Sequence, residues 1–232
     1  MPGRLPVTYL LSLVALPVVW LIVAFPVFDM VSGTDGTGGS MALECGRRVT
    51  NDADDGVSVI SSVRVIVSWD EEWSSLHGAD AEARARRVVL DAGSLFRGVG
   101  IHLLPVGTTP WESPDGAASI SALMKAAHQA VPLDGADIVA VLSGQEPKTT
   151  EDGFAEVGGR FVIVAHHPER PGRDAQVLAH EMSHLFGAHH GCDVPGYEGL
   201  MAEVGFEEPD IICPCTRRIL EMNARRFHEP SG

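Results

Sequence analysis

Positive charge is what this 232-residue sequence has least of. Lys and Arg together number 17 against 31 Asp and Glu, which gives a formal net charge of −14, and Lys125 and Lys148 are its only lysines. Proteins that bind nucleic acids usually present a basic face, so this composition argues against that class. A net charge of this sign and size instead suits a soluble domain whose copies repel one another.

Cysteine is also scarce, with four in the chain: Cys45, Cys192, Cys213 and Cys215. An even number is compatible with two disulfides in an oxidising compartment. We expect Cys192 to pair with Cys213 or Cys215, which would tie down the segment between them. Cys213 and Cys215 are too close in sequence to pair with each other, so Cys45 takes the remaining partner or stays free.

Charged residues are missing altogether from Leu5 to Phe28, LPVTYLLSLVALPVVWLIVAFPVF. As a helix this segment would be roughly 36 Å long, against a membrane hydrocarbon core of about 30 Å. It also exceeds the roughly 7–15 apolar residues of a secretory signal. We therefore expect residues 1–28 to be an N-terminal transmembrane signal anchor, with a cleaved signal peptide and a secreted protein as the alternative. Arg4 precedes the segment and Asp29 follows it, so the N-terminus is expected in the cytoplasm and the rest beyond the cell membrane.

Residues 29–56 are rich in Gly, Ser, Thr and Asp, which predicts a flexible extracytoplasmic tether. The folded domain is expected to span residues 57–232. Its strand-like and helix-like segments alternate, and this β-α-β-α-β order calls for an α/β fold with a mostly parallel sheet covered by helices. Asp80 and Asp174 are expected to cap two of the helices. The strands are expected at 58–69, 101–106, 137–144, 154–159 and 161–166, and the helices at 80–96, 117–131, 173–187 and 216–227.

The stretch HEMSHLFGAHH, from His180 to His190, carries the chemistry. His180 and His184 are four residues apart on a predicted helix, so both imidazoles lie on one face and can share a zinc ion. Glu181 is adjacent to the first ligand, where it can serve as general base toward a water at the metal. Gly187 favours the left-handed conformation that turns the chain sharply, which lets His190 return to the metal as the third ligand.

The alternative for this stretch is a helix whose His and Glu are merely solvated. H-E-x-x-H alone arises by chance in roughly three such chains per hundred, but the string that includes Gly187 and His190 arises in about one in ten thousand. The metal-site interpretation is therefore favoured.

The full string fits H-E-x-x-H-x-x-G-x-x-H, so the chain resembles the metzincin zinc metalloendopeptidases. The resemblance implies a mixed five-stranded sheet with one antiparallel edge strand, here 154–159, before the zinc helix. It also implies a small irregular C-terminal subdomain that ends in a helix. A tight turn with a methionine beneath the zinc is a further implication, and YEGLMAE supplies Met201 for it. Ordinary core packing is the alternative for Met201.

The branch within the metzincins follows from residues beyond the zinc string. Astacin-like and serralysin-like members carry a Tyr two residues after the methionine, where this chain has Glu203. Adamalysin-like (reprolysin) members lack that Tyr and resemble the chain most, although they usually have Asp directly after the third histidine, where Gly191 and Cys192 intervene before Asp193. Archaemetzincins also place a Cys here, but their added four-cysteine zinc spacing is absent from this sequence.

The resemblance implies a zinc-dependent endopeptidase acting on peptides or proteins at the cell surface or outside the cell, with Glu181 as the catalytic residue. An extended substrate could add to the edge strand. The alternative is a catalytically inactive, zinc-stabilised binding or adhesion module on the same fold, which the retention of Glu181 argues against. A zinc-dependent amidase with a non-peptide substrate also fits the motif.

Two weaker signals concern other histidines and Cys45. His166 and His167 are expected in a solvated loop, and His77 is expected to be isolated. Cys45 lies next to Gly46, as in the propeptides that keep some metzincins latent, so it is a candidate fourth zinc ligand.

Overall fold

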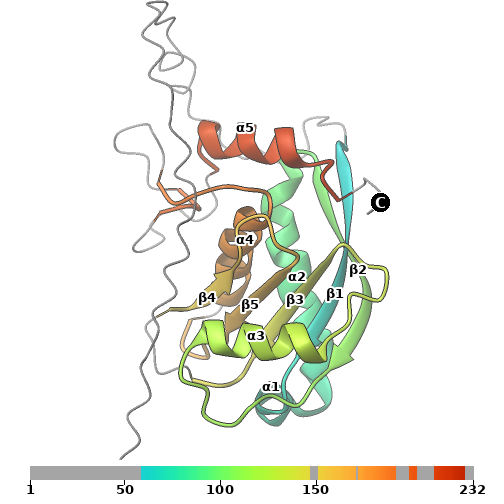
Figure 1. Ribbon diagram of the computed structural model, residues 1–232, viewed down its shortest axis with the longest axis vertical. Coiled ribbons are helices and arrows are strands. Elements are labelled where there is room, and N and C mark those ends of the chain that lie inside the picture. Colours follow the sequence, from blue (N-terminus) through green and yellow to red (C-terminus); the bar gives the residue numbers. More distant parts are fainter. Residues whose placement is uncertain (1–58, 147–150, 171, 192–198, 203–211, 228–232) are drawn as a thin grey trace, which may run out of the picture. The chain divides into compact units, whose positions relative to one another are not determined.

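The computed structural model describes residues 59–146, 151–170, 172–191, 199–202 and 212–227. Within them, five strands form one sheet in the order β2-β1-β3-β5-β4 (Figure 1). Neighbouring strands are parallel except for β4, which pairs antiparallel with β5 at one edge. The strands are β1 (Ser61–Trp69), β2 (Ile101–Pro110), β3 (Ile138–Ser143), β4 (Gly153–Ala155) and β5 (Phe161–Ala165). The predicted α/β class and the mixed sheet with an antiparallel edge strand are confirmed.

Helices cover both faces of this sheet. In Figure 1, α3 lies in front of the sheet, and α2 and α4 lie behind it. Alternate residues of β3 point to opposite faces of the sheet. Ile138 and Ala140 pack in the core with α2 and α4, and Val139 packs in the core with α3. A strand buried on both faces reads as the continuous apolar run seen in the sequence. The helices are α1 (Glu71–His77), α2 (Ala81–Arg97), α3 (Ile120–Ala130), α4 (Arg173–Leu185) and α5 (Pro214–Asn223), with a 3₁₀ turn at Gly78–Asp80.

Helix α1 was not predicted from the sequence. It is short, and Trp73 is its only buried residue, so it has no helical periodicity to detect. Its N-cap is Asp70, whose Oδ1 accepts a hydrogen bond from the backbone N–H of Trp73 at 2.8 Å. Asp80 precedes α2 as predicted, but its side chain makes no capping hydrogen bond.

The capping prediction for Asp174 is wrong, whereas His166 and His167 lie in a loop as expected but are only partly exposed. Helix α4 begins at Arg173 after Gly172, and Asp174 lies in its first turn rather than at the cap. The Asp174 carboxylate accepts a hydrogen bond from the backbone N–H of His167 at 2.9 Å and lies 2.6 Å from Nδ1 of His166. The two histidines are therefore partly buried partners of this carboxylate, because the chain leaving β5 folds back onto the start of α4.

Helix α5 docks on the C-terminal end of α4. The last carbonyls of a helix have no partners inside it, and here Asn223 donates from Nδ2 to the carbonyl of Phe186 at 2.8 Å. Arg226 donates from Nη1 to the carbonyl of Leu185 at 2.5 Å, and the Gly158 N–H donates to the carbonyl of His184 at 2.9 Å. These bonds fix the end of α4, and the predicted C-terminal helix is present.

Several predictions concern residues that the structure does not describe. The anchor at 1–28, the tether at 29–56, Cys45 and Cys192 lie outside the described residues, so the domain boundaries and the disulfide pairing stay predictions. Among the described residues, no helix has both the length and the apolar character needed to cross a membrane.

Candidate metal centre

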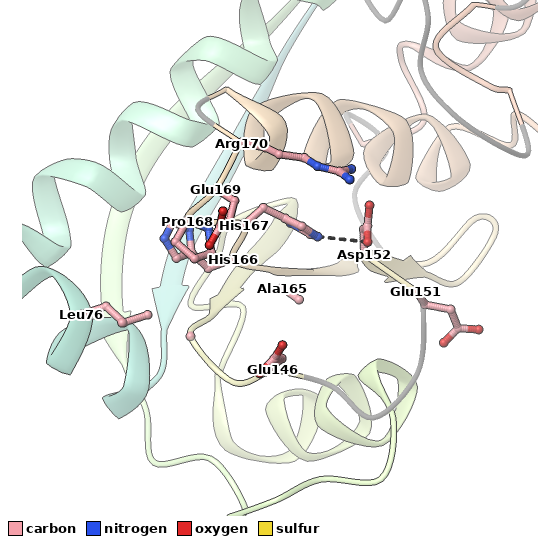
Figure 2. Close-up of a pocket in the computed structure, with 11 residues that line it drawn as sticks. Leu76, Glu146, Glu151, Asp152, Ala165, His166, His167, Pro168, Glu169 and Arg170 are labelled. Atoms are coloured by element: carbon pink, nitrogen blue, oxygen red, sulfur yellow. Dashed lines mark ion pairs between the residues drawn. The ribbon is translucent and has the colours of Figure 1, made fainter.

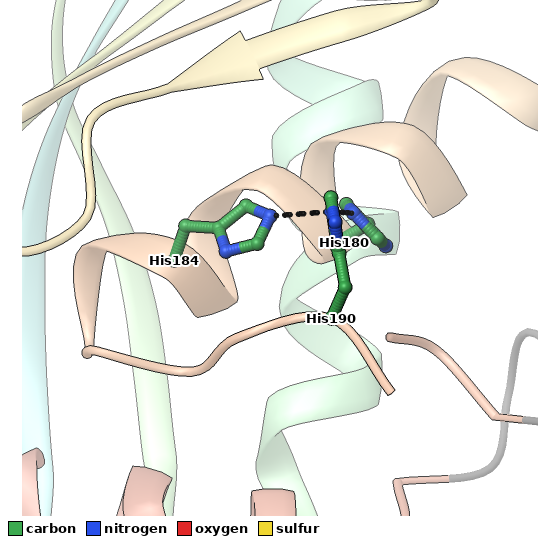
Figure 3. Close-up of side chains that lie close together, drawn as sticks. All are labelled: His180, His184 and His190. Atoms are coloured by element: carbon green, nitrogen blue, oxygen red, sulfur yellow. Dashed lines mark hydrogen bonds between the residues drawn. The ribbon is translucent and has the colours of Figure 1, made fainter. Parts of the chain in front are cut away.

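Three histidines converge on one point beside α4. His180 and His184 are 5% and 7% exposed and lie on the same face of the helix, and His190 returns to them from beyond the helix end (Figure 3). Nε2 of His190 lies 3.1 Å from Nε2 of His180 and 3.1 Å from Nε2 of His184. The neighbouring His189 is exposed and does not belong to this group.

Backbone carbonyls orient the two helical histidines. Nδ1 of His180 lies 2.6 Å from the carbonyl oxygen of Leu200, and Nδ1 of His184 lies 2.7 Å from that of Ala188. A carbonyl oxygen can only accept, so each Nδ1 carries the ring proton and each Nε2 turns a lone pair toward the shared point.

This arrangement fits a metal ion better than it fits a hydrogen-bonded cluster. Neutral His190 has at most one N–H at Nε2, and it cannot donate to two acceptors equally at 3.1 Å. Three nitrogens at about 2.0–2.1 Å from a tetrahedral zinc ion would lie about 3.3 Å apart, close to the observed spacing. Zinc is one of the transition metals that imidazole nitrogens bind well. Three such ligands leave the fourth position of a tetrahedral zinc ion open.

Burial keeps the helical histidines in the form that binds metal. The pKa of His180 is lowered to about 4, chiefly by burial and also by His184 and His190, while the hydrogen bond to Leu200 opposes the shift. Burial likewise lowers the pKa of His184. Both rings are therefore neutral at pH 7, as a ligand must be.

Gly187 makes the turn that brings His190 back. Its φ is 89°, in the left-handed region, and its N–H donates to the carbonyl of His184 at 2.9 Å. The N–H of Ala188 then donates to the carbonyl of Ser183 at 3.1 Å, which closes the helix end. Gly187 thus lies at the turn that follows the helix.

Met201 lies in a tight turn against the histidines. The N–H of Ala202 donates to the carbonyl of Gly199 at 2.9 Å, and the carbonyl of Met201 accepts from the N–H of Gly191 at 2.8 Å. This turn thereby supplies the Leu200 carbonyl to His180 and holds the chain just after His190. Met201 is also part of the hydrophobic core, so its proposed place beneath a metal stays a prediction.

Glu181 points toward the edge strand. Its carboxylate accepts a hydrogen bond from the backbone N–H of Ala155 in β4. The pKa of Glu181 is raised to about 8, chiefly by burial and also by Glu151 and Asp152, while the hydrogen bond from Ala155 opposes the shift. A divalent cation nearby would lower this pKa again, because it favours the ionised form.

The groups that orient the site were missed by sequence reasoning. The carbonyls of Leu200 and Ala188 and the N–H of Ala155 are backbone atoms, which leave no signature in residue type. Their positions depend on turns and on strand pairing. Of these features, only the turn at Met201 could be predicted, and only from the family resemblance.

Comparisons with known proteins agree with this geometry. The reprolysin-type model of metallo-peptidase family M12 matches residues 60–215, well over half of the chain. No curated protein matches the chain.

Solved structures that share the fold include the following two. A chain from a chaperone–substrate complex has a TM-score of 0.55 and 15% identity, and the match covers 72% of this chain and 34% of that one. Archaemetzincin from Methanopyrus kandleri has a TM-score of 0.52 and 16% identity over 75% of this chain and 99% of that one. This chain therefore spans about a third of the first structure and nearly all of the second.

Proposed function

This chain belongs to metallo-peptidase family M12, and on that premise we propose that it is a zinc-dependent endopeptidase acting on extracellular or cell-surface proteins. Family and fold support a zinc metallopeptidase. The observation that carries the proposal is the convergence of three imidazole Nε2 atoms on one point, with the Glu181 carboxyl on the same helix.

The roles of the residues follow from their positions. His180, His184 and His190 would hold the ion through Nε2. A zinc ion held there supplies a Lewis acid that polarises a water molecule and the substrate carbonyl. Glu181 accepts a proton from the attacking water and then passes it to the leaving amine. The Ala155 N–H keeps the Glu181 carboxylate oriented between these transfers.

Strand β4 offers a place for the substrate. It is the last strand of the sheet and pairs with β5 on one side only. An extended peptide can add to such an edge through main-chain hydrogen bonds, which tolerate many side chains. We propose that the substrate lies along β4, next to Glu181.

The experiment is a peptide-library cleavage assay on the full-length chain, purified in detergent, with and without a chelator. We expect chelator-sensitive cleavage, and a fall in kcat on the order of 10²–10⁴-fold for Glu181→Gln with zinc still bound. Glu82→Gln removes an exposed carboxylate from α2 and should keep wild-type activity. Bound zinc without chelator-sensitive cleavage of any peptide would refute the proposal and favour an inactive binding module.

We also propose, from the sequence alone, that residues 1–28 anchor the chain in the cell membrane with its catalytic domain outside. The chain should remain in the membrane pellet after an alkaline wash and should be digested by protease added to intact cells. Recovery in the soluble fraction with a new N-terminus beyond Phe28 would instead indicate a cleaved signal peptide.

We further propose that Cys213, rather than Cys215, pairs with Cys192. In support, Cys213 is buried at the N-cap of α5. Peptide mapping without reductant should recover the Cys192 and Cys213 peptides as one species. Recovery of Cys192 linked to Cys45 or Cys215 would refute this pairing.

A further inference from the structure

Asp152 lies immediately before β4 and contacts two other elements. Its Oδ2 forms an ion pair with Nη2 of Arg173, the first residue of α4, at 2.5 Å. Its Oδ1 lies 3.0 Å from Nε2 of His167, which follows β5 (Figure 2). One carboxylate therefore joins the start of the edge strand, the end of its neighbour and the start of the zinc helix.

Asp174 extends these contacts into a network. Its Oδ1 accepts the backbone N–H of His167 at 2.9 Å and lies 3.6 Å from Nδ1 of the same ring. The imidazole of His167 thus lies between two carboxylates, one from each side of the β4–α4 boundary. We call the set Asp152, His167, Arg173 and Asp174 the Asp152 network.

The Asp152 network is shielded from solvent more than an ordinary surface ion pair. The side chains of Asp152, His167 and Arg173 are 29%, 22% and 15% exposed. Charges that are partly buried are screened less by water and salt than exposed ones. Burial alone would raise the pKa of Asp152, but Arg173 and His167 outweigh it and hold this pKa below its ordinary value. Asp152 is therefore ionised at neutral pH.

Phe154 and Ala155 of β4 pack against the cores on the two faces of the sheet, and the Asp152 network holds the start of the strand. It is three residues long and has a single partner strand. It also touches the site directly, since a Cβ built on Gly153 would lie 2.7 Å from Cγ of Glu181 and 2.7 Å from Cγ1 of Val177. The N–H of Ala155, two residues further on, binds the Glu181 carboxylate. The place of β4 against α4 therefore sets the place of that carboxylate.

We propose that Asp152 is a positioning residue for the peptidase reaction, which holds β4 against α4 through Arg173 and His167 so that Ala155 keeps Glu181 aligned. Asp152 acts through Glu181 and is not itself a catalytic residue. The inference rests on the proposed endopeptidase function. It adds to that function a polar link outside the zinc motif.

The test compares Asp152→Asn with a matched control in the full-length chain. Asp91→Asn makes the same change in an exposed ion pair, with Arg87 on α2 at 2.9 Å. We expect Asp152→Asn to lower kcat on the order of 10–100-fold, since small misplacements of a catalytic group have effects of that size. Zinc content should stay at the wild-type value, KM should change less than kcat, and hydrogen–deuterium exchange should rise in peptides that cover β4. Asp91→Asn should match the wild type in all four measurements.

Two further variants separate positioning from a general loss of structure. Asp152→Glu keeps the charge and should recover most of kcat. The double variant Asp152→Asn/Arg173→Gln should lose no more activity than the more impaired single variant, because both changes break the same link.

Three results would overturn the proposal: wild-type kcat in Asp152→Asn, loss of its zinc in step with its activity, or unchanged exchange in β4. A wild-type chain without chelator-sensitive cleavage would refute the proposed function instead. In that case, unchanged exchange in β4 of Asp152→Asn would still refute the link between Asp152 and the strand.

Discussion

His184 donates a hydrogen bond from Nδ1 to the carbonyl of Ala188, 2.7 Å away, across the turn at Gly187. This bond sets the tautomer of His184, a candidate ligand. Its acceptor, Ala188, lies in the segment that leads to His190, another candidate ligand. The turn is therefore coupled to the metal centre, and a change in its conformation should be measurable as a change in metal affinity.

Gly187→Ala should weaken zinc binding. At φ 89° a Cβ is strained, and it would also lie 3.4 Å from Nδ2 of Asn223. Strain of this kind costs on the order of 1–3 kcal/mol, and relaxing it would move the Ala188 carbonyl away from His184. Competition with a chromophoric chelator should show a zinc affinity lowered roughly 10-fold, at the low end for a lost outer contact.

Gly135→Ala is the matched control for the turn. Gly135 also has a left-handed φ, of 75°, and no atom within 4 Å of an added Cβ, but it lies in the loop before β3. It should lower stability to a similar extent and leave zinc affinity unchanged. Equal loss of zinc affinity in both variants would show that general destabilisation is responsible.

His190→Ala and His189→Ala should differ sharply. The first removes one of three converging Nε2 atoms, and the second removes an exposed ring outside the group. Losing a ligand should lower zinc affinity by at least about 100-fold, since even outer contacts are worth about 10–100-fold. The chelator competition should leave His189→Ala near the wild type. The opposite ranking would mean that His189 is the ligand.

Those parts of the fold and site that depend on local spacing could be predicted. The four-residue separation of His180 and His184 places them on one face of a helix whatever surrounds it. The buried strands β3 and β5 have continuous apolar runs, and α2 and α4 have helical periodicity. Each of these signals is contained in a short window of sequence.

Features that depend on contacts between distant segments could not be predicted. Asp152 contacts Arg173 because the loop before β4 and the start of α4 lie close together in space. The residue types alone do not predict that contact. His166 and His167 were assigned to a solvated loop for the same reason. Strand β4 is shorter than expected, three residues instead of six, because the chain turns away after Ala155.

Asp70→Ala should destabilise the fold strongly. The buried Asp70 carboxylate accepts from the backbone N–H groups of Trp73 and Gly144 at 2.8 and 2.9 Å and from the hydroxyl of Ser143. Losing the N-cap and leaving two N–H groups without their acceptor should cost roughly 2–4 kcal/mol. The measurement is the free energy of unfolding from denaturant titration.

Asp70→Asn should cost less than Asp70→Ala. Its Oδ1 can still accept both N–H groups, and its Nδ2 can donate to the Ser143 hydroxyl. Asp91→Ala, at an exposed position on α2, should stay within about 0.5 kcal/mol of the wild type. Equal losses in the two Asp70 variants would show that the negative charge, rather than the set of hydrogen bonds, is what the site requires.

The contribution of Asp152 to stability should disappear in acid. The pKa of Asp152 in the folded chain lies below its ordinary value of 3.8, because Arg173 and His167 outweigh the effect of burial. The unfolded chain therefore takes up the proton first as the pH falls. The stability that Asp152 adds is fully present above 3.8 and is lost as the pH falls through the lower folded value.

Thermal unfolding of the wild type and of Asp152→Asn from about pH 6 to about pH 2.5 checks this sign. Near pH 6 the wild type should have the higher unfolding midpoint. The difference between the two midpoints should disappear as the pH falls below 3.8, the ordinary pKa of an Asp. Arg173, His167 and Glu181, which interact with Asp152, are the same in both proteins. Their effects largely cancel in the difference between the two midpoints. A gap that stays constant or widens in acid would mean that Asp152 is not held in its ionised form by Arg173 and His167.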